Sequence, residues 1–162
     1  MNPVHFTGEE LIDMAVRIEE NGLRFYTDAA KTAKSKSVKD TFGMLAGEEK
    51  EHIKTFAGFR KLLSDKGSFG FDPYGEEAGQ YLNALADSEV FTRADEGAKL
   101  AAKVKDEIQA VNAAISMEKD SLLFYYEMQK MIRGKDKIVL DKLIEQEREH
   151  LRKLTVLSKD LG

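Results

Sequence analysis

The chain has no cysteine, no tryptophan, two prolines and three histidines among its 162 residues. Without cysteine it can form no disulfide, no thiolate nucleophile and no metal site built from thiolates. Any metal ion must therefore be held by Glu, Asp, His or Tyr side chains. Both prolines lie within the first 73 residues, so the second half of the chain lacks the strongest helix breaker.

Charge and hydropathy narrow the class of protein. The net charge is −4 and no basic cluster stands out, which argues against a nucleic-acid partner. No apolar run approaches the length of a membrane span, and the N-terminus lacks the apolar core of a signal peptide, so we expect a cytoplasmic protein without a membrane partner. The length suits a single domain over residues 1–162, and the 42% hydrophobic and 33% charged residues are typical of amphipathic helices.

Two of the three histidines occur in the same short pattern, Glu-x-x-His. Glu49 precedes His52, and Glu147 precedes His150, 98 residues later. Residues three apart on a helix face the same way, so each pair can reach one metal ion. The third histidine, His5, lies in the N-terminal tail, where we expect it to be solvated.

Both patterns interrupt an apolar seam with helical spacing. The seam residues are Phe42, Leu45, Phe56, Phe59 and Leu63 in the first case, and Leu140, Leu143, Leu154, Leu157 and Leu161 in the second. This spacing places the Glu and the His of each pattern on the buried face of a helix. An unpaired carboxylate there costs several kcal/mol, so it must be neutralised, paired or bound to metal. A solvated charged face suits the other charged residues nearby, which are Glu48, Glu51, Arg148 and Glu149.

The periodicity predicts an all-α fold, a four-helix bundle made of two helical hairpins. The long helices are expected at about 8–33, 38–65, 104–133 and 136–160. Ser37 with Asp40 predicts the cap of the second helix. The crossover, about 66–103, is expected to contain short helices. It is long enough to run the length of the bundle, which allows an up-down-down-up order.

The two halves form an internal repeat. A shift of 99 residues places Glu19 on Glu118 and Tyr26 on Tyr125. Each half thus offers one Glu from its first helix and Glu-x-x-His from its second. All four Glu lie about twelve residues inside their helices, or roughly 18 Å, so antiparallel helices bring them into one layer. Four Glu and two His in one layer predict a two-metal site. Glu20 is the alternative to Glu19 if the first helix is rotated, although the repeat favours Glu19.

Four further side chains are candidates to support this layer. Tyr26 and Tyr125 each lie seven residues beyond the first Glu of their half, two turns along the same face. Each is either an ordinary core aromatic residue or a hydroxyl that hydrogen-bonds a ligand carboxylate. Glu48 and Gln146 each lie four residues before a candidate histidine and could orient its second ring nitrogen.

Four segments carry a family resemblance. They are AVRIEENGLRFY at 15–26, EKEH at 49–52, the stretch from AISME at 114–118 to FY at 124–125, and EREH at 147–150. With these segments in this order, the chain resembles the ferritin-like di-iron carboxylate superfamily, and specifically the rubrerythrin family. The resemblance covers nearly the whole chain.

The resemblance implies a site for two iron ions. It implies that Glu49 and Glu147 bridge the irons, that Glu19 and Glu118 are terminal ligands, and that His52 and His150 complete the two shells. Rubrerythrins carry a further Glu three residues before the third-helix ligand, where this chain has Ile115. They also usually carry a rubredoxin domain that delivers electrons. This sequence shows none, so we expect a separate electron-donor protein as a partner.

The donor set and the resemblance together indicate redox chemistry. Oxygen and imidazole ligands without thiolates suit iron or manganese, and zinc is compatible with the ligands alone. Two irons can exchange two electrons with one bound oxidant. The leading hypothesis is therefore a di-iron oxidoreductase that reduces peroxide or dioxygen. The alternative is an iron-binding or storage protein with ferroxidase activity. We expect a homodimer for the enzyme, whereas storage requires a large hollow shell.

Overall fold

A computed structural model describes residues 8–63, 80–85, 94–132 and 134–162 of the chain. Its helices are α1 (Gly8–Thr32), α2 (Lys36–Leu63), α4 (Glu96–Lys103), α5 (Glu107–Met131) and α6 (Lys135–Asp160), and residues 80–85 add a short helical stretch. The four long helices form the predicted bundle, and the crossover contains short helices as expected. His5 lies outside the described residues.

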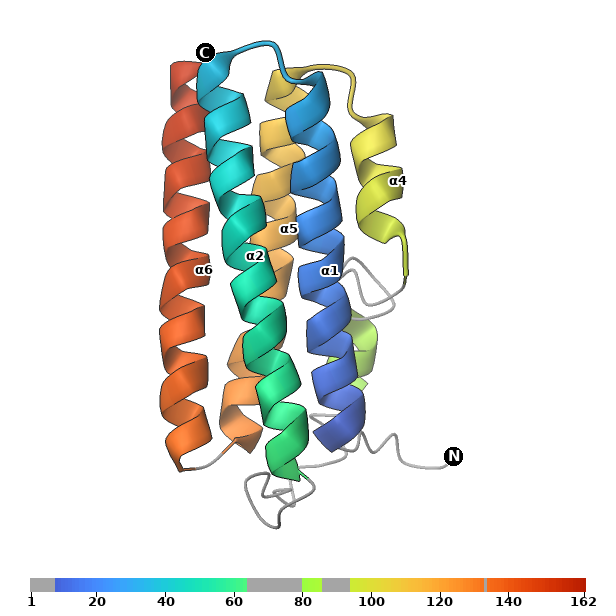
Figure 1. The fold of residues 1–162 in the computed structure, drawn as a ribbon, viewed down its shortest axis with the longest axis vertical. Helices are drawn as coiled ribbons and strands as arrows, with labels where there is room; N and C mark the ends of the chain where they lie inside the picture. The colour runs from blue at the N-terminus through green and yellow to red at the C-terminus, as the bar shows by residue number, and fades with distance from the viewer. Residues whose placement is uncertain (1–7, 64–79, 86–93, 133) are drawn as a thin grey trace.

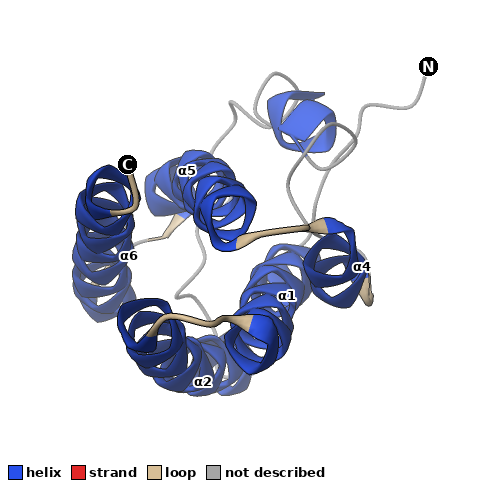
Figure 2. Ribbon diagram, turned by 90° about the horizontal axis from the view of Figure 1, so that it is seen from above, coloured by secondary structure: helices blue, strands red, loops and turns tan. Residues whose placement is uncertain are grey.

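The long helices follow the predicted up-down-down-up order. In Figure 1, α1 and α6 run upward and α2 and α5 run downward. Seen from above in Figure 2, α1 neighbours α2 and α5, α6 neighbours the same two helices, and α4 lies outside α1. A carboxylate oxygen of Glu107, the first residue of α5, accepts hydrogen bonds from the backbone N–H groups of Lys34 (2.6 Å) and Ser35 (2.5 Å). The start of α5 is thereby fixed against the turn between α1 and α2.

Two helix starts differ from the prediction because other residues provide the caps. The second helix begins at Lys36, and the hydroxyl oxygen of Ser35 accepts the N–H of Val38 at 3.4 Å, so Ser35 and not Ser37 caps it. The third long helix begins at Glu107 and not near residue 104, because the Asp106 carboxylate accepts the N–H of Gln109 at 2.8 Å. The other predicted ends of the long helices agree with the structure to within two residues.

The buried apolar side chains form two clusters, one toward each end of the bundle. The lower cluster, near the start of α1, includes Ile12, Phe56, Met128 and Leu140. The upper cluster, near the end of α1, includes Phe25, Phe42, Val111 and Leu154. The buried Glu and His side chains occupy the middle of the helices, between the two clusters. Apolar side chains therefore flank the polar layer on both sides along the bundle axis.

Helix α4 is fixed against α1 through a glycine. The N–H of Gly97 donates to Oδ1 of the buried Asn21 at 2.9 Å. A Cβ atom at position 97 would lie only 1.9 Å from the backbone oxygen of Asn21. Only glycine allows this approach, so α4 is held on the outer face of α1.

Candidate metal centre

Four helices contribute to one buried layer of carboxyl and imidazole groups. Each of the six side chains named by the sequence is at most 3% exposed: Glu19, Glu49, His52, Glu118, Glu147 and His150. Glu20, the alternative to Glu19, lies on the exposed surface of α1. The rotated arrangement of the first helix is therefore wrong, and the internal repeat identified the inward-facing residue.

The layer contains two overlapping groups that could each hold a metal ion. In each group the candidate ligand atoms lie within 4.8 Å of one another. One group comprises Glu19, Glu49, His52 and Glu147, and the other comprises Glu49, Glu118, Glu147 and His150. Glu49 and Glu147 belong to both groups. Two adjacent positions with a shared pair of carboxylates have the geometry of a bridged two-ion site.

Both imidazole rings direct Nδ1 into the layer. Nδ1 of His52 lies 2.7 Å from a carboxyl oxygen of Glu147 and 3.2 Å from one of Glu19. Nδ1 of His150 lies 3.3 Å from Glu147 and 3.7 Å from Glu118. The rings stack with centroids 5.5 Å apart across the interface of α2 and α6. Nδ1 is therefore the ring atom of each histidine placed to ligate a metal ion.

The outer ring nitrogens, Nε2, bind partners from the opposite hairpin. Nε2 of His52 lies 2.8 Å from the amide oxygen of Gln146, and Nε2 of His150 contacts a carboxylate oxygen of Glu48. The sequence had paired each partner with the histidine of its own helix, and that pairing is wrong. All four side chains point across the interface of α2 and α6, so the facing helix supplies the nearer ring.

Two tyrosine hydroxyls connect α1 and α5 through the layer. The Tyr26 hydroxyl donates to Oε1 of Glu118 at 2.5 Å, and the Tyr125 hydroxyl donates to Oε1 of Glu19. Both tyrosines are completely buried. Burial, followed by the charge of the nearby carboxylates, raises the pKa of Tyr26 and of Tyr125 well above 10.0. Both hydroxyls therefore keep their protons and remain hydrogen-bond donors.

Burial and close contact set the protonation of the carboxyl groups. Burial and neighbouring carboxylates raise the pKa of Glu49 and of Glu147 well above 4.5. Burial also acts to raise the pKa of Glu118, but close contacts with Glu147 and His150 and the hydrogen bond from Tyr26 outweigh burial and lower that pKa to about 2. Burial likewise acts to raise the pKa of Glu19, but contacts with Glu49 and His52 outweigh burial and lower that pKa.

The histidines balance this charge in the metal-free layer. Burial acts to lower the pKa of His150, but the close approach of the Glu118 and Glu147 carboxylates outweighs burial and raises the pKa from 6.5 to about 10. Carboxylate partners likewise raise the pKa of His52 above its ordinary value despite burial. In the metal-free layer, these directions favour protonated histidines facing ionised Glu19 and Glu118, and they favour the protonated forms of Glu49 and Glu147.

The donor set fits two divalent cations. Fully deprotonated, four carboxylates carry the charge that neutralises two such ions, and two imidazoles add nitrogen ligands. Among the described residues, both carboxyl oxygens of Glu147 and Nδ1 of His150 are buried, and their close approaches to neighbouring side chains lack hydrogen-bond geometry. Buried polar atoms of this kind are costly unless a ligand satisfies them. Oxygen and imidazole donors suit iron or manganese, and zinc is compatible with them.

Gly22 is a feature of the site that the sequence analysis did not identify. A Cβ atom at this position would lie 3.3 Å from Cδ of Glu49 and 3.4 Å from Oε1. The missing side chain leaves room for a carboxyl group that both metal positions share. The sequence signal that could have identified Gly22 is its position three residues after Glu19. The equivalent position in the second half of the repeat is Ser121, three residues after Glu118 on α5.

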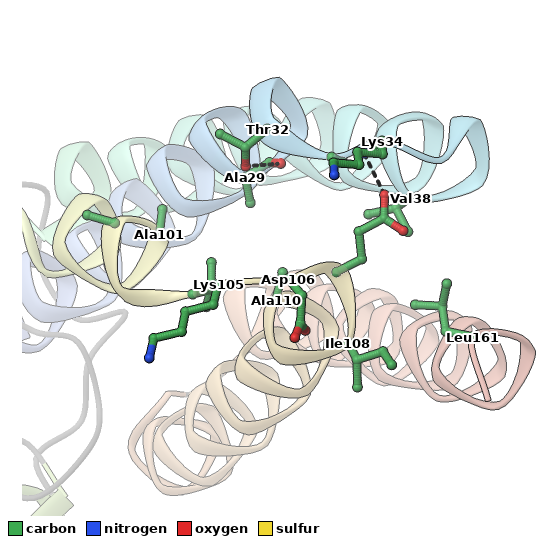
Figure 3. A pocket seen from close by; sticks show the side chains of 14 residues that line it. Ala29, Thr32, Lys34, Val38, Ala101, Lys105, Asp106, Ile108, Ala110 and Leu161 are labelled. Atoms are coloured by element: carbon green, nitrogen blue, oxygen red, sulfur yellow. Dashed lines mark hydrogen bonds between the residues drawn. The ribbon is translucent and has the colours of Figure 1, made fainter.

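An open cavity of about 690 Å³ lies at the upper end of the bundle, away from this layer. Figure 3 shows it between Ala29 and Thr32 of α1, Ala101 of α4 and Ala110 of α5. None of the six layer residues lines it. Ala29 is ten residues beyond Glu19, about 15 Å along α1, so the cavity is separate from the candidate metal centre.

Comparisons with known proteins agree with the geometry of this layer. The family model for rubrerythrin matches residues 10–158. Among solved structures, the chain is similar to a crystal structure described as a ferritin-like diiron-carboxylate protein from Thermotoga maritima. The two are 26% identical with a TM-score of 0.70, over 98% of this chain and 98% of that one. No curated protein matches at a significant level. Among the described residues, no helix is long and apolar enough to span a bilayer.

Proposed function

Because the chain belongs to the rubrerythrin family, we propose that it binds two iron ions in the buried layer and reduces peroxide or dioxygen there, with electrons from a separate donor protein. The observation that carries this proposal is the pair of overlapping ligand groups that share Glu49 and Glu147. Two ions held by common carboxylates stay close enough to act on one oxidant. The family membership favours iron over manganese and zinc.

Each ion would have its own terminal ligands. Glu19 and His52 would hold one ion, Glu118 and His150 would hold the other, and Glu49 and Glu147 would bridge them. When bound, the two irons supply the two electrons that cleave an O–O bond. With peroxide as the oxidant, two electrons and two protons yield two molecules of water. These protons must come from the protein or from solvent.

The protein's own residues orient the ligands and keep the layer dry. The Tyr26 and Tyr125 hydroxyls hold their protons on oxygen and fix one oxygen each of Glu118 and Glu19. The other carboxyl oxygens of both residues are thereby left for ligation. The apolar clusters above and below the layer exclude water, which strengthens electrostatic interactions inside it. Preorganised ligands and a dry site support two-electron chemistry.

Metal analysis with matched variants tests the binding site. Elemental analysis of protein purified without added metal, and again after anaerobic Fe(II) loading, should give two irons per chain after loading. Glu49→Gln and Glu147→Gln keep the side-chain shape but remove the shared charge, so each should lose at least one iron. Glu51→Gln and Glu149→Gln, two residues further along the same helices, should retain both. Full loading of Glu49→Gln and Glu147→Gln would overturn the proposed site.

Oxidation kinetics test the reaction. The Fe(II)-loaded protein should be oxidised by peroxide or dioxygen in stopped-flow absorption measurements, and a reductant should return it for another cycle. The mass of the native oligomer distinguishes the enzyme from a storage protein. We propose a homodimer. A hollow shell that accumulates iron far beyond two ions per chain would support storage, and an absence of oxidation by either oxidant would refute the proposed reaction.

A further inference from the structure

The two metal positions have the same set of ligands, but the residues next to their histidines differ in charge. Each position takes one terminal Glu, one His and the shared Glu49 and Glu147. Each terminal Glu accepts a hydrogen bond from a tyrosine of the facing helix. The outer nitrogen of His52 meets the amide oxygen of Gln146, whereas that of His150 meets a carboxylate oxygen of Glu48. Both halves of the repeat supply the same kinds of ligand, but the charge next to the two histidines differs.

This difference changes the two histidines as metal ligands. Nδ1 of each ring points into the layer, so a metal-bound ring carries its proton on Nε2 and donates it to the outer partner. A carboxylate acceptor draws this proton strongly and makes Nδ1 a better electron-pair donor, whereas a neutral amide oxygen does so weakly. His150 should therefore bind a cation more tightly than His52.

We infer that the two metal positions are inequivalent, that the first divalent cation occupies the position of Glu118 and His150, and that Glu48 is the positioning residue that sets this order. The inference rests on the proposed two-metal site. The Glu48 side chain is 42% exposed, so solvent weakens its effect. Changes to such outer partners of metal ligands alter affinity by about 10–100-fold, and we expect the lower end here.

Stepwise Co²⁺ titration of the intact protein, by calorimetry and visible absorption, tests the inference. Repulsion between two bound cations also separates the binding steps, so the comparison of variants decides the result. Glu48→Gln should weaken the first step about tenfold and bring the two constants together. Gln146→Glu should strengthen binding at the other position by a similar factor. Glu51→Gln, an exposed neighbour on α2, should change neither step and controls for surface charge.

The exchange variant Glu48→Gln/Gln146→Glu makes the test independent of overall affinity. In crystals grown with one equivalent of Co²⁺, anomalous scattering should place the ion beside His150 in the wild type and beside His52 in the exchange variant. Equal occupancy of both positions in the wild type, or an unchanged first step in Glu48→Gln, would overturn the inference while leaving the two-metal site intact. Binding of fewer than two ions by the wild type would refute the proposed site itself, and with it this inference.

Discussion

The hydroxyl of Tyr26 on α1 donates a hydrogen bond to Glu118 on α5, with 2.5 Å between the two oxygens. The reciprocal contact joins Tyr125 on α5 to Glu19 on α1. Each tyrosine therefore supports the carboxylate of the other hairpin. The halves of the repeat are connected through their candidate ligands, so packing of the hairpins and assembly of the site depend on each other.

Removing one of these donors should weaken both stability and metal binding. Tyr26→Phe leaves the buried Glu118 carboxylate without one hydrogen bond, which should cost about 1.5–3 kcal/mol because the acceptor is charged. Chemical unfolding in chelator measures this loss, and metal titration should show weaker binding. Tyr126→Phe is the matched control, because Tyr126 is 39% exposed on the same helix as Tyr125. Equal stability of the two variants would contradict the role assigned to Tyr26.

A methyl group at position 22 should disturb the shared carboxylate. In Gly22→Ala the new Cβ would meet Cδ of Glu49 at 3.3 Å, so the Glu49 side chain must shift by a few tenths of an ångström. We expect roughly tenfold weaker metal binding with little loss of stability, because alanine gains about 0.5–1 kcal/mol over glycine in a helix. Gly47→Ala, with no atom within 4 Å of the new Cβ, should gain stability and bind metal normally. Identical metal affinity in both variants would show that the Glu49 side chain can accommodate the added methyl group without moving out of its ligand position.

The stability of the metal-free protein should fall as pH rises from about 7 to about 10. The pKa of His150 is 6.5 for an unperturbed histidine, as in the unfolded chain, and about 10 in the folded chain. Its contribution to the free energy of unfolding is therefore fully present below pH 6.5 and is lost as pH rises through about 10. Glu49 and Glu147, with pKa values raised above 4.5, act in the same direction. Glu118, with its pKa lowered to about 2, loses its contribution only in acid.

Thermal melts across this pH range, with chelator and with saturating Co²⁺, provide the measurement. Metal binding requires deprotonated ligands, so the extra stability that Co²⁺ gives should increase over the same interval. The two series should therefore diverge with rising pH. A metal-free midpoint that stays constant or rises would show that the layer does not hold its protons in the folded state.

Ile115 should affect the choice of oxidant. It lies three residues before Glu118 on α5 and packs against the upper apolar cluster, where the family resemblance implies a further carboxylate. We expect the wild-type Fe(II) form to react with dioxygen as well as with peroxide. Ile115→Glu should shift the preference toward peroxide, and Ile115→Gln controls for polarity without charge. Stopped-flow measurements of the oxidation rate of the Fe(II) form with each oxidant test this expectation. A wild type that consumes peroxide orders of magnitude faster than dioxygen would show that Ile115 does not set the preference.

The sequence by itself determined which side chains share the polar layer. The 3.6-residue period of a helix fixes which positions face inward, so Glu49 and His52 had to point to the same side of their helix as Phe42 and Phe56. The repeat then placed Glu19 and Glu118 at matching depths. These properties are local to one helix or follow from helix length, and no knowledge of the neighbouring helix was needed.

Only the tertiary structure decided which side chains contact one another across helices. Tyr26 reaches Glu118 of the other hairpin, and Glu48 contacts His150 and not the histidine of its own helix. Such pairs depend on which helices are adjacent and how far each is shifted along its axis, and helical periodicity carries no information on either. The charge difference between Glu48 and Gln146 is visible in the sequence, but its meaning depends on the ring that each residue faces.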